Sequence, residues 1–537
     1  MTFSSPEPFS ITVPWRYIDG IIEYSTDKVH WIDVKTSTAT ASFDGERYVL
    51  YLSGTGNTRI SEEDAGKWST ECKQIYCSGN IETLLDWQTV KQGRHPKMDA
   101  GCFNYMFAYW PLLTAPSLPA VNLTANCYSW MFAYCGLTTA PELPATVLAD
   151  SCYAYMFFYC PLLTATQELP ATTLADSCYS GMFSYCTSLT TAPELPATVL
   201  ADSCYSGMFS YCSSLRSAPQ LPSDSLKRRC YMSMFEGCTS LTTPPNLPAT
   251  YIDLDWGNCY RNMFKGCVSL VTAPNLPART LAGGCYEGMF EGCTNLTAAP
   301  KLPAAGILQG NCYRNMFKGC TNLSSIPAIS AIEVITGSCC EMFNGCTKIK
   351  LSATQTGSYT NAYRIDASDL AHIYQNALTD MFAGTGGTFT GTPVINTTYY
   401  LDSSIEIVGG FNTVTADKIT KYFTVSNGSY YFAGSGTTFT SNNGGVNNST
   451  ATTTLTALQN MSISFDYSYS SEKNYDKFTL IVAGTTVANG LSGATTRKSY
   501  KGTLQKGQQI VFKYAKDSSS HKNDDRCTFS NLQVNLQ

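Results

Sequence analysis

Apolar positions in the middle of the chain recur in one fixed pattern. Between residues 102 and 346 the chain repeats variants of CYxxMFxGCxxLxxAPxLPAxxLA, as in the copy that begins at Cys178. Ten Met-Phe pairs mark the copies, at steps of 25 to 29 residues: Met106, Met131, Met156, Met182, Met208, Met234, Met263, Met289, Met316 and Met342. A period near 26 that persists through ten copies predicts a stack of coils.

Each copy contains one segment that predicts a strand and one that predicts a helix. Leu189 and Leu195 lie six residues apart, which places both on one face of an extended segment. Leu200, Cys204 and Met208 then follow at i, i+4 and i+8, the spacing of a short amphipathic helix. Glycines stand where a left-handed C-terminal cap of that helix is expected, at Gly237, Gly266, Gly292, Gly319 and Gly345. The expected fold is an α/β leucine-rich-repeat solenoid of about ten 26-residue coils.

The string MFxGCTSLT, followed by a proline-rich strand and a returning helix, resembles the BspA-like leucine-rich repeats of bacterial surface proteins and of viruses that infect those bacteria. The resemblance covers about half of the chain. It implies a right-handed solenoid with a role in adhesion or recognition rather than catalysis. The first copy departs by having Trp110 where later copies have cysteine, and the last by having Ser338 and Cys339 in place of Cys-Tyr. Terminal copies of a repeat array are expected to be atypical.

Flanking segments predict β-sandwiches. Residues 1–100 alternate polar and apolar positions, as in Tyr48–Ser53, and we expect a sandwich that caps the solenoid of residues 101–350. Residues 351–400, with a degenerate Met-Phe echo at Asp380–Gly384, are expected to close its other end. Residues 401–537 contain further alternating segments and resemble jelly-roll modules of bacterial surface proteins.

Cysteines are the most conspicuous reactive residues. Of the 23, 16 form eight pairs eight residues apart, from Cys127 and Cys135 to Cys312 and Cys320. Residues at this spacing in a helix lie about 12 Å apart, too far for a disulfide, whereas equivalent cysteines of neighbouring coils could approach about 5 Å. Cross-coil bridges are therefore possible, but we expect reduced, buried thiols. Zinc is not expected, because CxxC pairs are absent and the four histidines are scattered.

Positions that vary between copies are the candidate binding sites. Aromatic residues fill two positions four residues apart in the first three copies: Tyr105, Tyr109, Trp130, Tyr134, Tyr155 and Tyr159. Such side chains suit sugar rings and protein hot spots; the alternative is that they pack on one another or under a neighbouring domain. A second candidate column, on the predicted strand face, is Glu142, Glu168 and Glu194, with a solvated column as the alternative.

One cofactor is considered. Four acidic residues of the C-terminal region could meet as a calcium site, with ordinary solvated loop acids as the alternative: Glu472, Asp476, Asp517 and Asp525. No other cofactor is expected.

Composition and the lack of certain motifs exclude several classes of function. Only 14% of residues are charged, the net charge is -5, and Lys227–Arg229 is the one short basic run, so nucleic acid is not an expected partner. Apolar stretches long enough for membrane insertion are absent, as is an export signal at the start of the chain. Motifs for catalysis are also absent, and an enzyme is not expected.

The leading prediction is a non-enzymatic recognition and structural protein at a virion surface, such as a bacteriophage fibre or receptor-binding appendage. Its partners would be a host-surface glycan or protein and other virion proteins. The alternatives are a bacterial cell-surface adhesin and an array of carbohydrate-binding modules. The sequence is compatible with a homo-oligomer and leaves the oligomeric state open.

Overall fold

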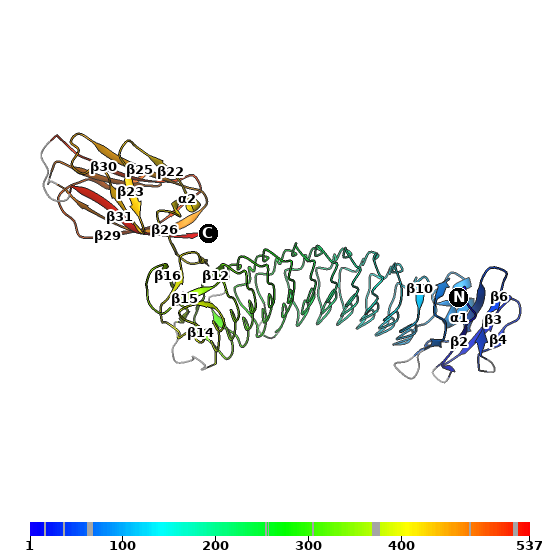
Figure 1. The fold of residues 1–537 in the computed structure, drawn as a ribbon. Coiled ribbons are helices and arrows are strands. Elements are labelled where there is room, and N and C mark those ends of the chain that lie inside the picture. Colours follow the sequence, from blue (N-terminus) through cyan, green and yellow to red (C-terminus); the bar gives the residue numbers. More distant parts are fainter. Residues whose placement is uncertain are drawn as a thin grey trace. The chain divides into compact units, whose positions relative to one another are not determined.

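The computed structural model describes residues 1–15, 18–35, 38–61, 68–252, 255, 257–302, 306–367, 376–471, 474–518 and 525–536 (Figure 1). The chain divides into two compact units, which are described separately. The first contains Met1–Leu323, Ile329–Lys348 and Ile365–Thr397. The second contains Ser324–Ala328, Ile349–Arg364 and Thr398–Gln537. The segment 351–400, expected as one cap, is thus shared between the two units.

The first unit begins with a small β domain. Its larger sheet has the order β10-β9-β1-β7-β3-β4, with β6 also on β7. These strands are β1 (Thr2–Ser5), β3 (Ile21–Ser25), β4 (Ile32–Asp33), β6 (Ser42–Phe43), β7 (Tyr48–Thr55), β9 (Ile75–Ser78) and β10 (Leu112–Thr114). A second sheet has the order β5 (Ala39–Thr40), β2 (Ser10–Thr12), β8 (Ser69–Thr70). Helix α1 (Thr83–Lys91) packs against β7.

The first coil is joined to this domain. Strand β10 belongs to the first coil and pairs in parallel with β9. The Phe3 ring lies 6.1 Å from the rings of both Phe107 and Trp110. The indole N–H of Trp110 donates to the carbonyl oxygen of Trp68 at 2.9 Å. The tryptophan that replaces a cysteine in the first copy therefore fills the junction with the N-terminal domain.

The predicted α/β leucine-rich-repeat fold is wrong. The described part of residues 101–350 contains no α-helix, and the chain's second helix, α2 (Ile419–Tyr422), lies in the other unit. The predicted strands are mostly reduced to isolated bridges between successive copies, such as Thr139 with Ala165 and Thr173 with Val199. Two prolines in each copy remove the backbone donors that a longer ladder would need.

Stacked coils of tight turns take the place of the helices (Figure 1, cyan to green). Successive backbone N–H groups alternate between two kinds of acceptor. The N–H of Tyr179 donates to the carbonyl of Cys204 in the following coil at 3.0 Å, whereas that of Ser180 donates to Ser177, three residues earlier, at 3.0 Å. The same alternation continues through the turn segment of each coil. Local turns and coil-to-coil bonds therefore satisfy the backbone together.

A four-residue period governs these turns. Every fourth residue has a positive φ, as at Ser177 (54°), Gly181 (60°) and Tyr185 (63°). The side chains that point inward follow the same period, at Cys178, Tyr179, Met182, Phe183 and Cys186, all buried. The glycines expected to end helices do adopt left-handed conformations, with φ of 72° to 76°, but they stand within this series of turns.

Identical side chains stack inside the coils. Phenylalanine rings of successive coils lie 5.5 to 5.8 Å apart and nearly parallel, from Phe107 to Phe343 and on to Phe382 of the Met-Phe echo. Inward tyrosines form a second column from Tyr128 to Tyr313. Each coil thus buries the apolar face of its neighbour, which a single copy could not do alone.

All 23 cysteines are free thiols, and all but Cys340 are buried. The second cysteine of each copy donates to a phenylalanine carbonyl in the preceding coil, as Cys186 does to Phe157 at 3.2 Å. Burial raises the pKa of Cys160 and Cys346 to about 12, so these thiols stay protonated near neutral pH.

Short strands end the first unit. Strand β11 (Ile307–Leu308) pairs with β14 (Glu333–Val334), and β13 (Ser330–Ala331) pairs with β17 (Asp366–Ala367). Strand β18 (Gly386–Gly387) follows the Met-Phe echo.

The described part of the chain contains no helix with the length and apolar character that a membrane span requires.

The second unit combines short strands with a β-sandwich. Strand β19 (Tyr399–Asp402) pairs with both β15 (Lys350–Ser352) and β16 (Tyr359–Tyr363), and β12 (Ser325–Pro327) pairs with β20 (Glu406–Val408). One sandwich sheet has the order β23-β24-β31-β26-β29, with β21 also on β31, and the other has the order β22-β25-β30-β27-β28. The bounds are β21 (Asn412–Thr413), β22 (Phe423–Asn427), β23 (Phe432–Ser435), β24 (Thr438–Ser441), β25 (Thr450–Ala457), β26 (Met461–Ser470), β27 (Lys477–Val482), β28 (Thr485–Leu491), β29 (Lys498–Leu504), β30 (Gln509–Ala515) and β31 (Arg526–Leu536).

Candidate functional site

The outer aromatic column of the first coils is a continuous row of tyrosines, which we call the tyrosine ladder; two of its ring pairs are stacked and two are tilted. Its ring centroids lie 4.4, 5.2, 6.0 and 4.5 Å apart in order along the chain. The ladder contains the predicted Tyr109, Tyr134 and Tyr159 and continues through Tyr185 and Tyr211. The repeat period brings the five tyrosines together, because each occupies the same position in its coil.

A second aromatic column runs beside the ladder. Tyr105 stacks on Trp130 at 5.4 Å, and Trp130 stacks on Tyr155 at 4.5 Å. The column ends over Gly181, where an added Cβ would lie only 2.2 Å from a ring carbon of Tyr155. All six aromatic residues predicted from the sequence therefore pack in columns, and a small residue in the next coil makes room for the last ring.

Phe158 connects the two columns and was not predicted as a site residue. Its ring lies 5.1 Å from Trp130 in one column and 5.5 Å from Tyr134 in the other. The neighbouring copies have Ala133 and Ser184 at this position. That single departure from small residues is the signal in the sequence that could have identified it.

The ladder presents ring edges and hydroxyl groups to solvent. Each interior ring has a neighbour on both sides, whereas Tyr109, at the end of the ladder, is 58% exposed and Tyr159, between two tilted neighbours, is 47% exposed. Partial desolvation and the neighbouring Tyr109 raise the pKa of Tyr134 above its usual value. The Tyr134 hydroxyl is thus neutral near pH 7 and can both donate and accept hydrogen bonds. This arrangement suits contact along the ladder better than stacking of a sugar on one ring face.

The predicted acidic column is exposed. Glu142, Glu168 and Glu194 all lie at the surface, one coil apart. In the portion of the chain that the structure describes, no hydrogen bond or ion pair is seen for their carboxylates. Like charges at about 5 Å repel by somewhat under 1 kcal/mol in water, so the column does not stabilise the fold.

A second acidic column accompanies the first and was missed. The Asp150 carboxylate accepts the N–H of Asp176 at 3.2 Å, and the Asp176 carboxylate accepts the N–H of Asp202 at 2.9 Å. These aspartates therefore have a structural role in linking coils. Their identical position in three successive copies was the available signal in the sequence.

The acids considered for calcium are arranged around a lysine. Asp476 and Asp525 are buried, and the ammonium of Lys516 lies 3.4 Å from one and 2.5 Å from the other. Asp517 contributes its backbone N–H, which donates to Asp476 at 3.1 Å, while Glu472 lies outside the described residues. The positive charge between the two aspartates is thus supplied by Lys516. No group of three or more metal-ligating side chains is found among the residues described.

Comparison with known proteins adds little. No protein family and no curated protein matches the chain. A solved structure that matches is the secreted serine protease VesC from Vibrio cholerae, at 15% identity, covering 26% of this chain and 29% of that chain. Its TM-score of 0.19 carries no argument about fold or activity.

Proposed function

We propose that the chain is a non-enzymatic recognition and adhesion protein that contacts a surface glycan or protein through the tyrosine ladder. The observation that carries the proposal is the ladder itself, a row of five tyrosines, four exposed and Tyr185 half-buried, held in an unfavourable backbone conformation. Their φ angles are 54° to 68°, a region that strongly favours glycine.

The coil backbone does not require tyrosine at these positions. The last five coils have glycine at the equivalent position, with φ between 72° and 76°. A left-handed conformation costs a residue other than glycine roughly 1–2 kcal/mol. Stacking of two aromatic rings contributes about 0.5–1.5 kcal/mol of stability. The two effects nearly cancel, so stability alone gives no reason for tyrosine, and binding supplies one.

The acidic columns favour a partner with basic or hydroxyl-rich groups. Glu142, Glu168 and Glu194 belong to the same half of the coil stack as the ladder and gain nothing from their mutual repulsion. Charge complementarity with a partner would increase the rate of association, and this increase would become smaller as the salt concentration rises. Display on a virion or on a bacterial surface stays a prediction from resemblance.

Replacement of ladder tyrosines by glycine tests the proposal. Glycine adopts the left-handed conformation without strain, so the triple variant Tyr109→Gly, Tyr134→Gly, Tyr159→Gly should fold normally. We expect binding of the fluorescently labelled protein to intact bacteria, measured by flow cytometry, to fall by roughly tenfold or more. The matched control is Tyr251→Ser, which removes an exposed tyrosine of a later coil.

Treatment of the bacteria separates the two partner classes. Periodate oxidation should abolish binding if the partner is a glycan, and protease treatment should abolish it if the partner is a protein. Equal binding by the triple variant and the unaltered protein would show that the ladder is not the recognition surface.

A further inference from the structure

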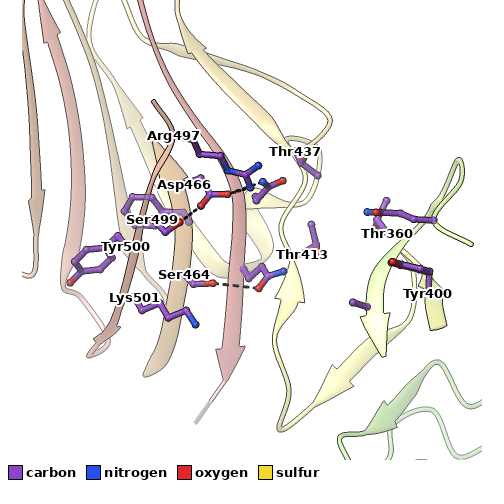
Figure 2. A pocket seen from close by; sticks show the side chains of 15 residues that line it. Thr360, Tyr400, Thr413, Thr437, Ser464, Asp466, Arg497, Ser499, Tyr500 and Lys501 are labelled. Carbon is purple, nitrogen blue, oxygen red and sulfur yellow. Dashed lines mark hydrogen bonds and ion pairs between the residues drawn. The ribbon is translucent and has the colours of Figure 1, made fainter. Parts of the chain in front are cut away.

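The second unit contains a polar cavity of about 570 Å³ that the sequence did not suggest (Figure 2). One wall is the sandwich sheet, with Ser464 and Asp466 on β26, Ser499 on β29 and Asn531 on β31. The opposite wall comes from β16 and β19, which contribute Thr360, Ala362 and Tyr400. A cavity of this size falls within the range that proteins use for small ligands.

The two walls are hydrogen-bonded to one another. Asn361 on β16 is buried; its amide oxygen accepts the N–H of Thr413 on β21 at 3.1 Å, and its amide nitrogen donates to Ile405 at 2.9 Å. Strand β21 in turn pairs with β31 of the sandwich. The cavity is therefore formed before any ligand arrives, which lowers the entropic cost of binding.

Asp466 organises the sandwich wall. Its carboxylate is buried and accepts hydrogen bonds from Ser499 at 2.6 Å, from Asn531 at 2.9 Å and from the guanidinium of Arg497. Burial alone would raise the pKa of Asp466, but these three donors outweigh it and hold the pKa below its usual value. The carboxylate therefore stays ionised and orients its three donors.

The cavity offers a surplus of positive charge. Asp466 is its only acidic lining residue in the described structure, and Arg497 and Lys501 are basic. The Arg497 side chain is 65% exposed, and one of its terminal nitrogens binds Asp466. The rest of its planar donor set matches a carboxylate, which can accept two parallel N–H bonds.

The remaining lining suits a hydroxylated ring. Ser464, Thr413, Thr437 and Gln533 supply hydroxyl and amide groups, and the Tyr500 ring lies beside them, 5.3 Å from Phe465. The hydroxyl oxygen of Thr360 is buried and, in the described part of the chain, has no hydrogen-bond partner. Such an atom is costly unless a ligand or water satisfies it.

We infer that this cavity binds an acidic saccharide, with the sugar carboxylate on Arg497 and Lys501 and the ring hydroxyls on the serine, threonine and amide groups. The inference goes beyond the tyrosine ladder, because it uses residues of the other unit and is tested separately from it. Two sources share the required chemistry: a sialylated glycan and a polymer of uronic acids.

Isothermal titration of the full-length protein tests the inference. The probes are 3′-sialyllactose and digalacturonate, with lactose as the neutral counterpart. We expect saturable binding of at least one acidic probe and at least tenfold weaker binding of lactose; the probe that binds identifies the source. Arg497→Ala should weaken binding of that probe by roughly ten- to hundredfold, because it removes a charge-assisted bidentate contact.

Two further variants distinguish a specific loss of binding from a loss of folding. Lys498→Ala removes the neighbouring exposed cation, which does not line the cavity, and should bind the probe as the unaltered protein does. Lys501→Ala leaves the bonds of Asp466 intact and should weaken binding by a few-fold at low salt, with an unchanged melting temperature.

Several outcomes would overturn the inference. These are absence of binding by both acidic probes at millimolar concentration, equal affinity for lactose, or unaltered affinity of the Arg497→Ala protein. The tyrosine-to-glycine triple variant should keep its affinity for the acidic probe, so failure of the ladder and failure of the cavity give different results.

Discussion

The first five coils and the last five share one backbone but differ in surface. Three residues after the methionine, the first five have tyrosine and the last five have glycine, all with positive φ. Two residues after the methionine, the first five have alanine, serine or phenylalanine, whereas later coils have alternating charges such as Lys265 and Glu291, whose charged groups lie 3.2 Å apart. One half is thus covered by stacked rings and the other by ion pairs between coils.

At the boundary between the two halves, the surface residues change while the backbone conformation stays the same. The Tyr211 ring lies over Gly237, where an added Cβ would be 2.5 Å from a ring carbon. The Tyr211 hydroxyl lies 3.4 Å from the carboxylate of Glu236, the first charged residue of the later series. The backbone specifies only a left-handed residue, so the chemistry of the surface can change from one coil to the next.

The largest expected effect should be the same in both halves. Phe183→Ala and Phe264→Ala each remove a buried ring from the inner phenylalanine column, whose members stack at 5.8 Å in the first case and 5.7 Å in the second. Each variant should lose about 3–5 kcal/mol of unfolding free energy in urea denaturation, because the coils leave a cavity. A large loss in only one half would mean that the two halves do not share a core.

A smaller effect should appear where a ring of one coil covers a glycine of the next. Gly181 and Gly207 have similar φ, 60° and 62°, but an added Cβ would lie 2.2 Å from Tyr155 at the first and 3.6 Å from Ser210 at the second. Thermal unfolding should show a loss of about 1 kcal/mol for Gly207→Ala and about 1–3 kcal/mol more for Gly181→Ala. In the Tyr155→Ala background the extra loss should disappear; its persistence would contradict the assigned clash.

Exchange of the residues that distinguish the halves should have opposite consequences. Gly266→Tyr places a strained tyrosine between Gly237 and Gly292 without a ring to stack on, and should cost about 1–2 kcal/mol. Tyr185→Gly loses stacking on Tyr159 and Tyr211 but relieves strain, and should change unfolding free energy by less than about 1 kcal/mol. Chemical denaturation of both variants measures the difference, and equal costs would refute the balance between stacking and strain.

The smallest expected effect concerns salt. Glu291→Gln removes the partner of Lys265 and should lower stability by about 0.2–1 kcal/mol at low ionic strength, and by less in 1 M salt. Glu168→Gln in the first half relieves repulsion instead and should be neutral or slightly stabilising. Melting temperatures at two salt concentrations check both variants; identical responses would remove the electrostatic distinction between the halves.

The periodicity of the chain could be predicted, but the conformation of its turns was misread. Ten copies near 26 residues apart correctly indicated that equivalent side chains stack. Apolar residues at i, i+1, i+4, i+5 and i+8, as from Cys178 to Cys186, have a period of four, whereas a helix would drift by about 80° over eight residues. Serine, asparagine and glycine at the same four-residue spacing were the sign of left-handed turns. Alternation was a better guide in residues 401–537, where the alternating segments form strands of a β-sandwich, such as β26.

The candidate sites likewise include some features that the sequence predicted and others that it did not. The aromatic columns could be read from positions that vary while the repeat stays constant, but the covering of their faces follows from the distance between coils, which the sequence does not contain. The Asp466 cavity joins residues from three segments far apart in sequence, Asp466 on β26, Arg497 just before β29 and Asn531 on β31, and no local motif marks it. The contacts of Lys516 with Asp476 and Asp525 were not foreseen, although Lys516 adjoins Asp517 in sequence.

The alternation of backbone hydrogen bonds makes every coil interchangeable with its neighbours. In the turn segment each coil accepts bonds from the one before and donates to the one after in the same pattern, so an added or deleted copy would restore the same bonding there on both sides. Residues 169–186 and 195–212 differ only at Thr173 and Val199, which shows how closely one copy can duplicate another. The coil array can thus gain or lose whole copies without a change in the bonding of the remaining coils.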